Sequence, residues 1–281
     1  MAHRTLVSCQ TLSQHLHDPA WVVVDCRHQL ADPAWGETCY REAHLPGARF
    51  LHLDHDLSSA PTGHNGRHPL PDPVRLAQRL RELGLNADSQ LVVYDQVSGG
   101  MAARLWWLAR WLGHSRVALL DGGFTAWTAA GLPLTGDIPP PVAGNFTGTP
   151  QAGDTVTADE LLARLGQPDL CLVDARAADR FAGENETLDP VGGHIPGARN
   201  RPWMSNLGAD GCFKPAAQLR EEWLTLLAGT PAADSIQQCG SGVTACHNLL
   251  ALEVAGLTGA RLYPGSWSEW CSDPSRPVVT G

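Results

Sequence analysis

The stretch Gln238–His247 (QCGSGVTACH) places a cysteine directly before a Gly-x-Gly turn, and a hydrophobic run follows the stretch. Gly240 and Gly242 let the backbone curl so that successive N–H groups face inward and form an anion-binding nest. A helix expected over residues 243–255 would point its positive N-terminal end into the same cup, which favours the thiolate form of Cys239. The stretch therefore predicts a nucleophilic cysteine whose persulfide anion is held by the N–H groups of Gly240, Ser241, Gly242, Val243 and Thr244.

Other chemistries need residues that this stretch lacks. A cysteine phosphatase closes a C-x5-R loop with an arginine that clamps phosphate oxygens, but the sixth residue after Cys239 is Ala245. The chain contains neither a G-x-x-x-x-G-K-[ST] phosphate loop nor a C-x-x-C zinc pair. A disulfide between Cys239 and Cys246 is disfavoured, because Cys246 is expected about a turn inside the helix. We assign Cys246 to packing and His247 to the helix surface.

An internal duplication organises the whole chain. Residues 22–27 (VVVDCR) reappear at 171–176 (CLVDAR), and residues 44–49 (HLPGAR) reappear at 194–199 (HIPGAR). Ordered matches at so long a period indicate duplicated domains rather than a solenoid. We expect a first domain over residues 1–134, a linker rich in proline and glycine over 135–154, and a second domain over 155–281.

Within each copy, short β-branched runs alternate with helical patterns. The runs WVVVD and QLVVYD in the first half, and CLVDA and DSIQQC in the second, predict buried strands. The alternation predicts an α/β fold in which each domain has an open, mainly parallel sheet flanked by helices. Aligning the copies sets Asp95 at the strand end where the second copy has Cys239. Ligands favour the carboxyl ends of such strands, so the second domain is expected to be catalytic and the first to be inert.

The composition excludes several classes of partner. The chain has 281 residues and a formal net charge of −9, so no basic surface is expected for nucleic acid or an anionic membrane. No apolar run approaches the roughly 20 residues that cross a bilayer, and the start of the chain has no apolar stretch typical of a signal peptide. These features predict a cytoplasmic protein, in which the eight cysteines stay reduced.

The duplication, the HIPGA-type element in each half, the LLDGG element and the terminal cysteine loop together resemble a two-domain rhodanese sulfurtransferase. The resemblance covers essentially the whole chain. It implies two rhodanese domains, the first inert with Asp95 in place of cysteine. It also implies that Cys239 takes sulfur from a small anionic donor as a persulfide and passes it to cyanide or a thiol, such as that of a thioredoxin-like protein. No metal or organic cofactor is implied.

The loop sequence separates subfamilies. Members that prefer thiosulfate carry basic residues in this loop, whereas CGSGVT has none and is similar to the loop of 3-mercaptopyruvate sulfurtransferases. That resemblance implies that Ser241 works with His68 (in GRHPLP) and Asp54 (in FLHLDHD) during C–S cleavage. It makes Arg180 (in AADRFAG) the residue that binds the donor.

One position departs from the resemblance. Mercaptopyruvate enzymes often have a second arginine about nine residues after Arg180, where this chain has Asp189. Arg176 is expected to be structural, because Arg27 recurs at its place in the inert half. Thiosulfate therefore stays open as the donor. A persulfide carrier with little turnover and a redox-sensing thiol protein are further alternatives.

Overall fold

The computed structural model describes residues 2–140 and 143–281. The chain forms two compact units that exchange short segments. The first unit comprises Met1–Ser59, Pro71–Gln151 and Ala209–Phe213, and the second comprises Ala60–Leu70, Ala152–Gly208 and Lys214–Gly281. The domain boundaries expected from the sequence did not include this exchange of segments. Residues 60–70 belong to the second unit although they lie in the first half of the chain. These short loops have no counterpart in the repeat, so their sequence does not show which unit they pack with.

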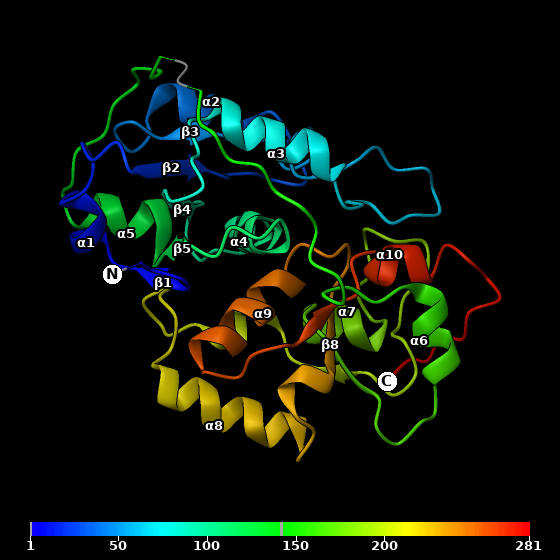
Figure 1. Ribbon diagram of the computed structural model, residues 1–281. Coiled ribbons are helices and arrows are strands. Elements are labelled where there is room, and N and C mark those ends of the chain that lie inside the picture. The colour runs from blue at the N-terminus through cyan, green and yellow to red at the C-terminus, as the bar shows by residue number, and fades with distance from the viewer. Residues whose placement is uncertain (1, 141–142) are drawn as a thin grey trace. The chain divides into compact units, whose positions relative to one another are not determined.

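Within its described residues, the first unit has a five-stranded parallel sheet in the order β1-β5-β4-β2-β3. Helices α1 to α5 surround this sheet (Figure 1). The strands are β1 (Leu6–Val7), β2 (Trp21–Asp25), β3 (Arg49–Phe50), β4 (Gln90–Tyr94) and β5 (Val117–Leu120), and the helices are α1 (Cys9–Ser13), α2 (Trp35–Glu42), α3 (Pro73–Glu82), α4 (Ala102–Trp111) and α5 (Gly123–Ala129).

The second unit has a four-stranded parallel sheet in the order β7-β6-β8-β9. Its strands are β6 (Cys171–Asp174), β7 (Arg199–Asn200), β8 (Ser235–Gln238) and β9 (Arg261–Leu262). Its helices are α6 (Ala158–Arg164), α7 (Ala178–Ala182), α8 (Ala216–Leu227), α9 (Ala245–Val254) and α10 (Ser266–Trp270), with short 3-10 turns η1 (Trp203–Asn206) and η2 (Ala232–Asp234).

The two sheets confirm the duplication. The order β5-β4-β2-β3 of the first unit returns as β9-β8-β6-β7 in the second. The partner of Asp25 across β2 and β4 is Tyr94, and the partner of Asp174 across β6 and β8 is Gln238, so the registers also correspond. Strand β1 is reduced in the second unit to one parallel bridge, between Thr155 and Leu262.

Local sequence explains why these elements form. All four residues of β6 and of β8 are buried, as expected for strands covered on both faces. Helix α6 begins with a capping box in which Thr157 accepts the Glu160 N–H and the Glu160 carboxylate accepts the Thr157 N–H. The core of the second unit gathers Ile195, Ile236, Trp267 and Trp270 between sheet and helices. This packing fixes the carboxyl end of β8, where Cys239 lies.

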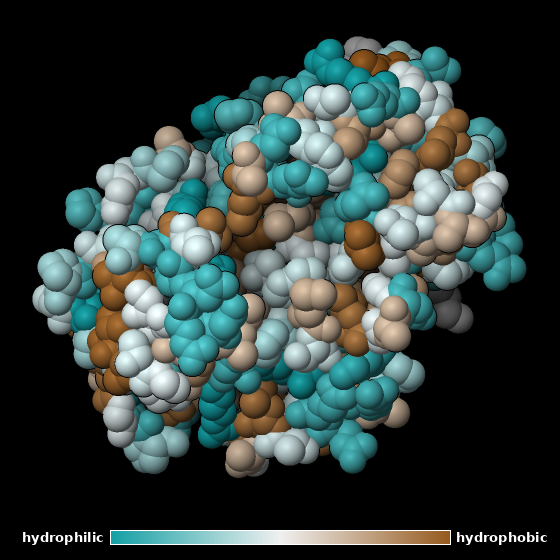
Figure 2. Space-filling view, turned by 180° about the vertical axis from the view of Figure 1, so that it is seen from behind, coloured by the Kyte–Doolittle hydropathy of each residue, from teal (hydrophilic) through white to brown (hydrophobic). Residues whose placement is uncertain are grey.

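On the face shown in Figure 2, hydrophobic residues form small groups among hydrophilic ones. Among the described residues, no helix is both long enough and apolar enough to pass through a bilayer.

Candidate active site

Cys239 directly follows β8, which pairs with β6 on one side and with β9 on the other. Its N–H donates to Ser266 Oγ at 3.1 Å, and its carbonyl accepts the Trp267 N–H at 3.0 Å. The residue is 2% exposed. The start of α10 therefore anchors the backbone on which the thiol is carried.

The loop over residues 239–244 is shaped by its glycines. Gly242 has φ +76°, and a Cβ on it would collide with the carbonyl oxygen of Pro264. The carbonyl of Gly240 accepts the Ser268 N–H at 2.9 Å, a second attachment to α10. Helix α9 begins at Ala245 with Thr244 as its N-cap residue, two residues later than the sequence predicted, because Val243 and Thr244 still belong to the turn.

The equivalent loop of the first unit shows what such a turn binds. Asp95 stands there at the position of Cys239, and its Oδ1 accepts the Gly99 N–H at 2.9 Å. Its Oδ2 accepts the N–H groups of Met101 at 2.8 Å and Ala102 at 3.0 Å. The duplicated scaffold thus gathers backbone donors around an anion carried by the residue that ends the strand. In the second unit this residue is a cysteine.

Ser241 and His68 meet within the second unit. Ser241 Oγ lies 2.8 Å from His68 Nδ1, and each residue is 6% exposed. His68 reaches the loop because its segment, Ala60–Leu70, is part of this unit. Asp54 belongs to the first unit, where its Oδ2 lies 3.9 Å from His28 Nε2 and 4.0 Å from His52 Nδ1. A joint role of Asp54 with Ser241 and His68 stays a prediction.

Arg176 is a structural cation, as expected from the repeat. It is 2% exposed, and its guanidinium donates to both oxygens of Asp174 and to the Gly193 carbonyl. In the first unit Arg27 makes the same bidentate pair with Asp25. Burial lowers the pKa of Arg176, but Asp174, Glu186 and Cys239 outweigh this effect and leave it raised. Arg176 therefore adds positive potential beside the thiol without being accessible to a ligand.

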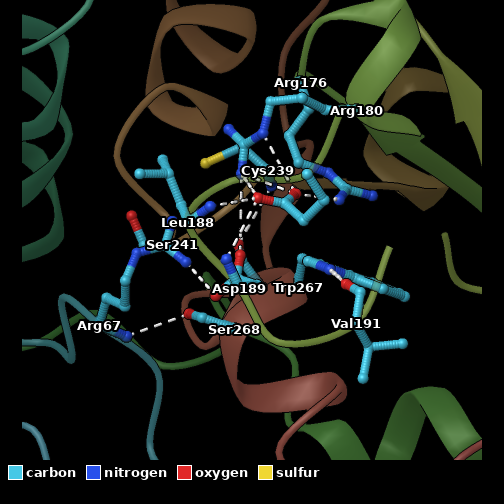
Figure 3. A network of polar contacts seen from close by, with 12 residues as sticks. Arg67, Arg176, Arg180, Leu188, Asp189, Val191, Cys239, Ser241, Trp267 and Ser268 are labelled. Atoms are coloured by element: carbon cyan, nitrogen blue, oxygen red, sulfur yellow. Dashed lines mark hydrogen bonds and ion pairs between the residues drawn. The ribbon is translucent and has the colours of Figure 1, made fainter. Parts of the chain in front are cut away.

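Arg180 comes from the short helix α7 and keeps an accessible edge. Its side chain is 21% exposed, and its guanidinium donates to both oxygens of Glu186 at 2.8 Å. Burial raises the pKa of Glu186, but the hydrogen bonds from Arg180 and from the N–H groups of Leu188 and Asp189 bring it below the ordinary value. Glu186 therefore stays ionised and fixes the Arg180 guanidinium. Figure 3 shows Arg180 near Cys239.

The structure adds residues that the sequence did not identify. Arg67 forms an ion pair with Asp189, and its backbone N–H donates to Ser268 Oγ at 3.0 Å. A Cβ on Gly240 would lie 2.8 Å from Arg67 Nη2 and 3.5 Å from Arg180 Nη2, so both guanidinium groups flank the residue after Cys239. The only sequence signal for Arg67 was its place next to His68.

Two expectations about α9 have different outcomes. His247 was expected on the surface, which is wrong: it is 0% exposed, with Nδ1 3.3 Å from Asn206 Nδ2 and its ring against Trp203. The reason is that α9 is buried on all sides along Ala245–Leu252, so a polar residue in this segment does not indicate a surface exposed to solvent. Cys246 is buried and donates its thiol to the Gly242 carbonyl at 3.3 Å, which fits the packing role.

The comparisons with known proteins agree on the family. A family model described as "Rhodanese-like domain" matches residues 8–130 and 157–273. A Pseudomonas aeruginosa protein named "Probable 3-mercaptopyruvate sulfurtransferase" is 52% identical over 100% of both chains. A "Thiosulfate sulfurtransferase" of Cricetulus griseus is 32% identical, covering 95% of this chain and 92% of its own. The structure of a 3-mercaptopyruvate sulfurtransferase from Leishmania major superposes with a TM-score of 0.84 at 30% identity, covering 95% of this chain and 74% of that one.

Proposed function

The chain belongs to the rhodanese-like family, and from this membership we propose that it is a sulfurtransferase that moves sulfur from 3-mercaptopyruvate to a thiol or to cyanide through a persulfide of Cys239. The relatives that match over nearly its whole length are named as sulfurtransferases. The observation that carries the choice of donor is the 2.8 Å contact between Ser241 Oγ and His68 Nδ1 in the Cys239 loop.

This contact matters because the two donors break different bonds. Cleaving mercaptopyruvate breaks a C–S bond and leaves a carbanion that must be stabilised as an enolate and protonated. Cleaving thiosulfate breaks an S–S bond and releases sulfite, which needs no proton on carbon. A buried hydroxyl hydrogen-bonded to an imidazole can deliver a proton, so this pair supports the keto-acid donor.

In the first step, the Cys239 thiolate attacks the sulfur of the donor. The new S–S bond forms as the C–S bond breaks, and the bonding pair goes to C3 of the product, which is the enolate of pyruvate. Ser241 donates a hydrogen bond to the developing enolate oxygen. The proton of the donor thiol passes through Ser241 and His68 to C3, so that pyruvate and the Cys239 persulfide anion result without net proton uptake.

In the second step, a nucleophile takes the outer sulfur. Cyanide attacks it, the S–S bond returns its electron pair to Cys239, and thiocyanate leaves. A thiolate acceptor reacts in the same way and becomes a persulfide. Backbone N–H groups of the Cys239 loop would hold the persulfide anion between the two steps, as those of the first unit hold Asp95.

Thiosulfate is the second candidate donor. Two partly accessible arginines, Arg67 and Arg180, flank the loop, and their side chains are 28% and 21% exposed. Paired cations suit a dianion even though the loop itself has no basic residue. A thioredoxin-like acceptor and a cytoplasmic location also stay predictions.

The test measures kcat/KM for mercaptopyruvate and for thiosulfate with cyanide as acceptor, in the wild type and in Cys239→Ser. We expect turnover of mercaptopyruvate to exceed that of thiosulfate and to vanish in the variant, and mass spectrometry to find one added sulfur on Cys239 after the donor alone. Activity that survives in Cys239→Ser would overturn the mechanism. A stable persulfide without turnover would identify a carrier, and a preference for thiosulfate would reverse the choice of donor.

A further inference from the structure

We propose that Arg67 is a second guanidinium that binds the carboxylate of the donor, and that Asp189 positions it. This inference rests on the proposed function, since it names part of the donor site. The sequence had suggested that one anion clamp was missing, because Asp189 stands where an arginine was expected. In the structure, Asp189 instead brings in an arginine from another segment.

The first observation is the position of the Arg67 guanidinium. Its Nη2 and that of Arg180 lie 2.8 Å and 3.5 Å from the point where Gly240 would carry a Cβ. Both cations therefore lie against one small residue, immediately after Cys239. Any side chain at position 240 would intrude on them, and its absence lets two guanidinium groups come close to a ligand held at the thiol.

The second observation is how the two cations are kept together. Asp189 is only 3% exposed in its side chain; its Oδ1 pairs with Arg67, and its Oδ2 lies 3.7 Å from Arg180 Nη2 (Figure 3). A carboxylate between two guanidinium groups offsets the repulsion that they would otherwise feel at this distance. Asp189 thus acts on the donor through Arg67 and is a positioning residue.

The third observation is that this ion-pair network is not saturated. Asp189 Oδ2 is buried and makes no hydrogen bond to any residue that the structure describes. By contrast, the structural pair of Arg176 and Asp174 uses several hydrogen bonds and hides both groups. Arg67 is 28% exposed in its side chain and so keeps a surface for a ligand. Unsaturated partners and partial exposure fit a site that rearranges on binding rather than a fixed structural bridge.

The fourth observation links this cation to the proton-transfer pair. Arg67 directly precedes His68, whose Nδ1 contacts Ser241, and the Arg67 N–H is tied to Ser268 Oγ. One short segment therefore delivers a planar cation for the carboxylate and an imidazole for the reacting end of the same molecule. A donor with a carboxylate next to its carbonyl, as in an α-keto acid, fits this pairing of groups.

The test separates anion binding from sulfur transfer. Rates of Cys239 alkylation are measured with iodoacetate and with neutral iodoacetamide, alongside KM and kcat for mercaptopyruvate, in Arg67→Gln, Arg67→Lys and the charge exchange Arg67→Asp/Asp189→Arg. Arg220→Gln is the matched control, because Arg220 is an exposed arginine of the same unit whose guanidinium donates to the carbonyls of Ala255 and Gly256. Thermal unfolding checks that each variant is folded.

For Arg67→Gln we expect KM to rise by about 10- to 100-fold, the loss of a charged hydrogen bond, while kcat changes little. We also expect the ratio of iodoacetate to iodoacetamide rates to fall several-fold. Arg67→Lys should keep that ratio but only part of the affinity, and the charge exchange should restore the ratio lost in Arg67→Gln by returning a guanidinium from position 189. The control should match the wild type.

An unchanged ratio and an unchanged KM in a folded Arg67→Gln variant would overturn the proposal. If Arg67→Gln does not fold, a charge-exchange variant that folds without the iodoacetate preference of the wild type would overturn it equally. Failure of the wild type to use mercaptopyruvate would instead contradict the proposed function, and the alkylation ratio would still report on Arg67.

Discussion

Ser241 and His68 form a buried pair, and the proton transfer that we propose for it requires both members. The Ser241 hydroxyl contacts Nδ1 of the His68 imidazole at 2.8 Å. A side-chain amide in place of the imidazole would keep this hydrogen bond but could not accept and return a proton. Replacement of histidine by asparagine does this, because the asparagine amide can occupy the place of Nδ1. This substitution therefore distinguishes a role of His68 in proton transfer from a role in packing alone.

At this scale we predict that Ser241→Ala lowers kcat/KM for mercaptopyruvate by about 100-fold, the ordinary contribution of a positioned proton donor. Thiosulfate turnover should change by less than about threefold. His68→Asn should give a similar loss, and the double variant no greater loss than either single one, because the pair acts as a unit. Steady-state assays with both donors measure this, and an equal loss for the two donors would remove the pair from proton transfer.

Single residues could be predicted only where the repeat or the family resemblance pointed to them. The duplication pointed to Cys239 by setting Asp95 opposite it, and the family resemblance suggested Ser241 and His68. Arg67 carried no pattern, since its partner Asp189 is 122 positions away. The same holds for His247, because its burial depends on how all sides of α9 are covered.

Among the elements, the strands were the most predictable. β2, β4 and β6 were expected from apolar runs, since a parallel strand buried on both faces is mostly apolar. β8 (SIQQ) was expected because it occupies the place of β4 in the repeat. The start of α9 was placed two residues too early, because Val243 and Thr244 complete the turn before the helix begins. The length of that turn depends on its attachment to α10, which no local pattern reveals.

The turn leads to a prediction about Gly242. In Gly242→Ala, the new Cβ meets the Pro264 carbonyl and the residue keeps φ +76°. We expect a loss of at least about 2 kcal/mol in stability and a fall in kcat/KM of more than tenfold, because the N–H groups around Cys239 move. Urea unfolding and assays with either donor measure these effects.

Gly166→Ala is the control for backbone strain alone. Gly166 has φ +78° in the same unit, but a Cβ there meets nothing within 4 Å. It should cost only about 1 kcal/mol and leave activity intact. Equal effects of the two substitutions would mean that the contact with Pro264 does not shape the loop.

At the scale of the whole molecule, acid stability depends on carboxylates held by cations. Burial raises the pKa of Glu222, but hydrogen bonds from Arg201, Lys214 and Gln218 outweigh this and lower it from 4.5 to about 2. A carboxylate whose pKa is depressed in the folded state stabilises the protein above its unfolded value. That stability is lost as the pH falls from about 4.5 to about 2.

We therefore predict that Glu222→Gln lowers the free energy of unfolding by about 1–2 kcal/mol at neutral pH, a value reduced for solvent screening. The difference from the wild type should shrink below pH 4.5 and disappear near pH 2. Urea unfolding across this range measures it. Glu221→Gln, at the exposed neighbouring position, is the control, and a pH-independent difference for Glu222→Gln would contradict the ionic origin of the effect.

Segments 60–70 and 209–213 also set the order in which the molecule can be completed during synthesis. Arg67 leaves the ribosome 172 residues before Cys239 (239 − 67), yet both belong to one unit. Conversely, the first unit must wait for residues 209–213, which are made only after half of the second unit. Folding half by half on the nascent chain is therefore incomplete for both units, and such distant closures are slow to form. Arg67 and His68 can therefore pack against the Cys239 loop only after the second half of this unit has been made.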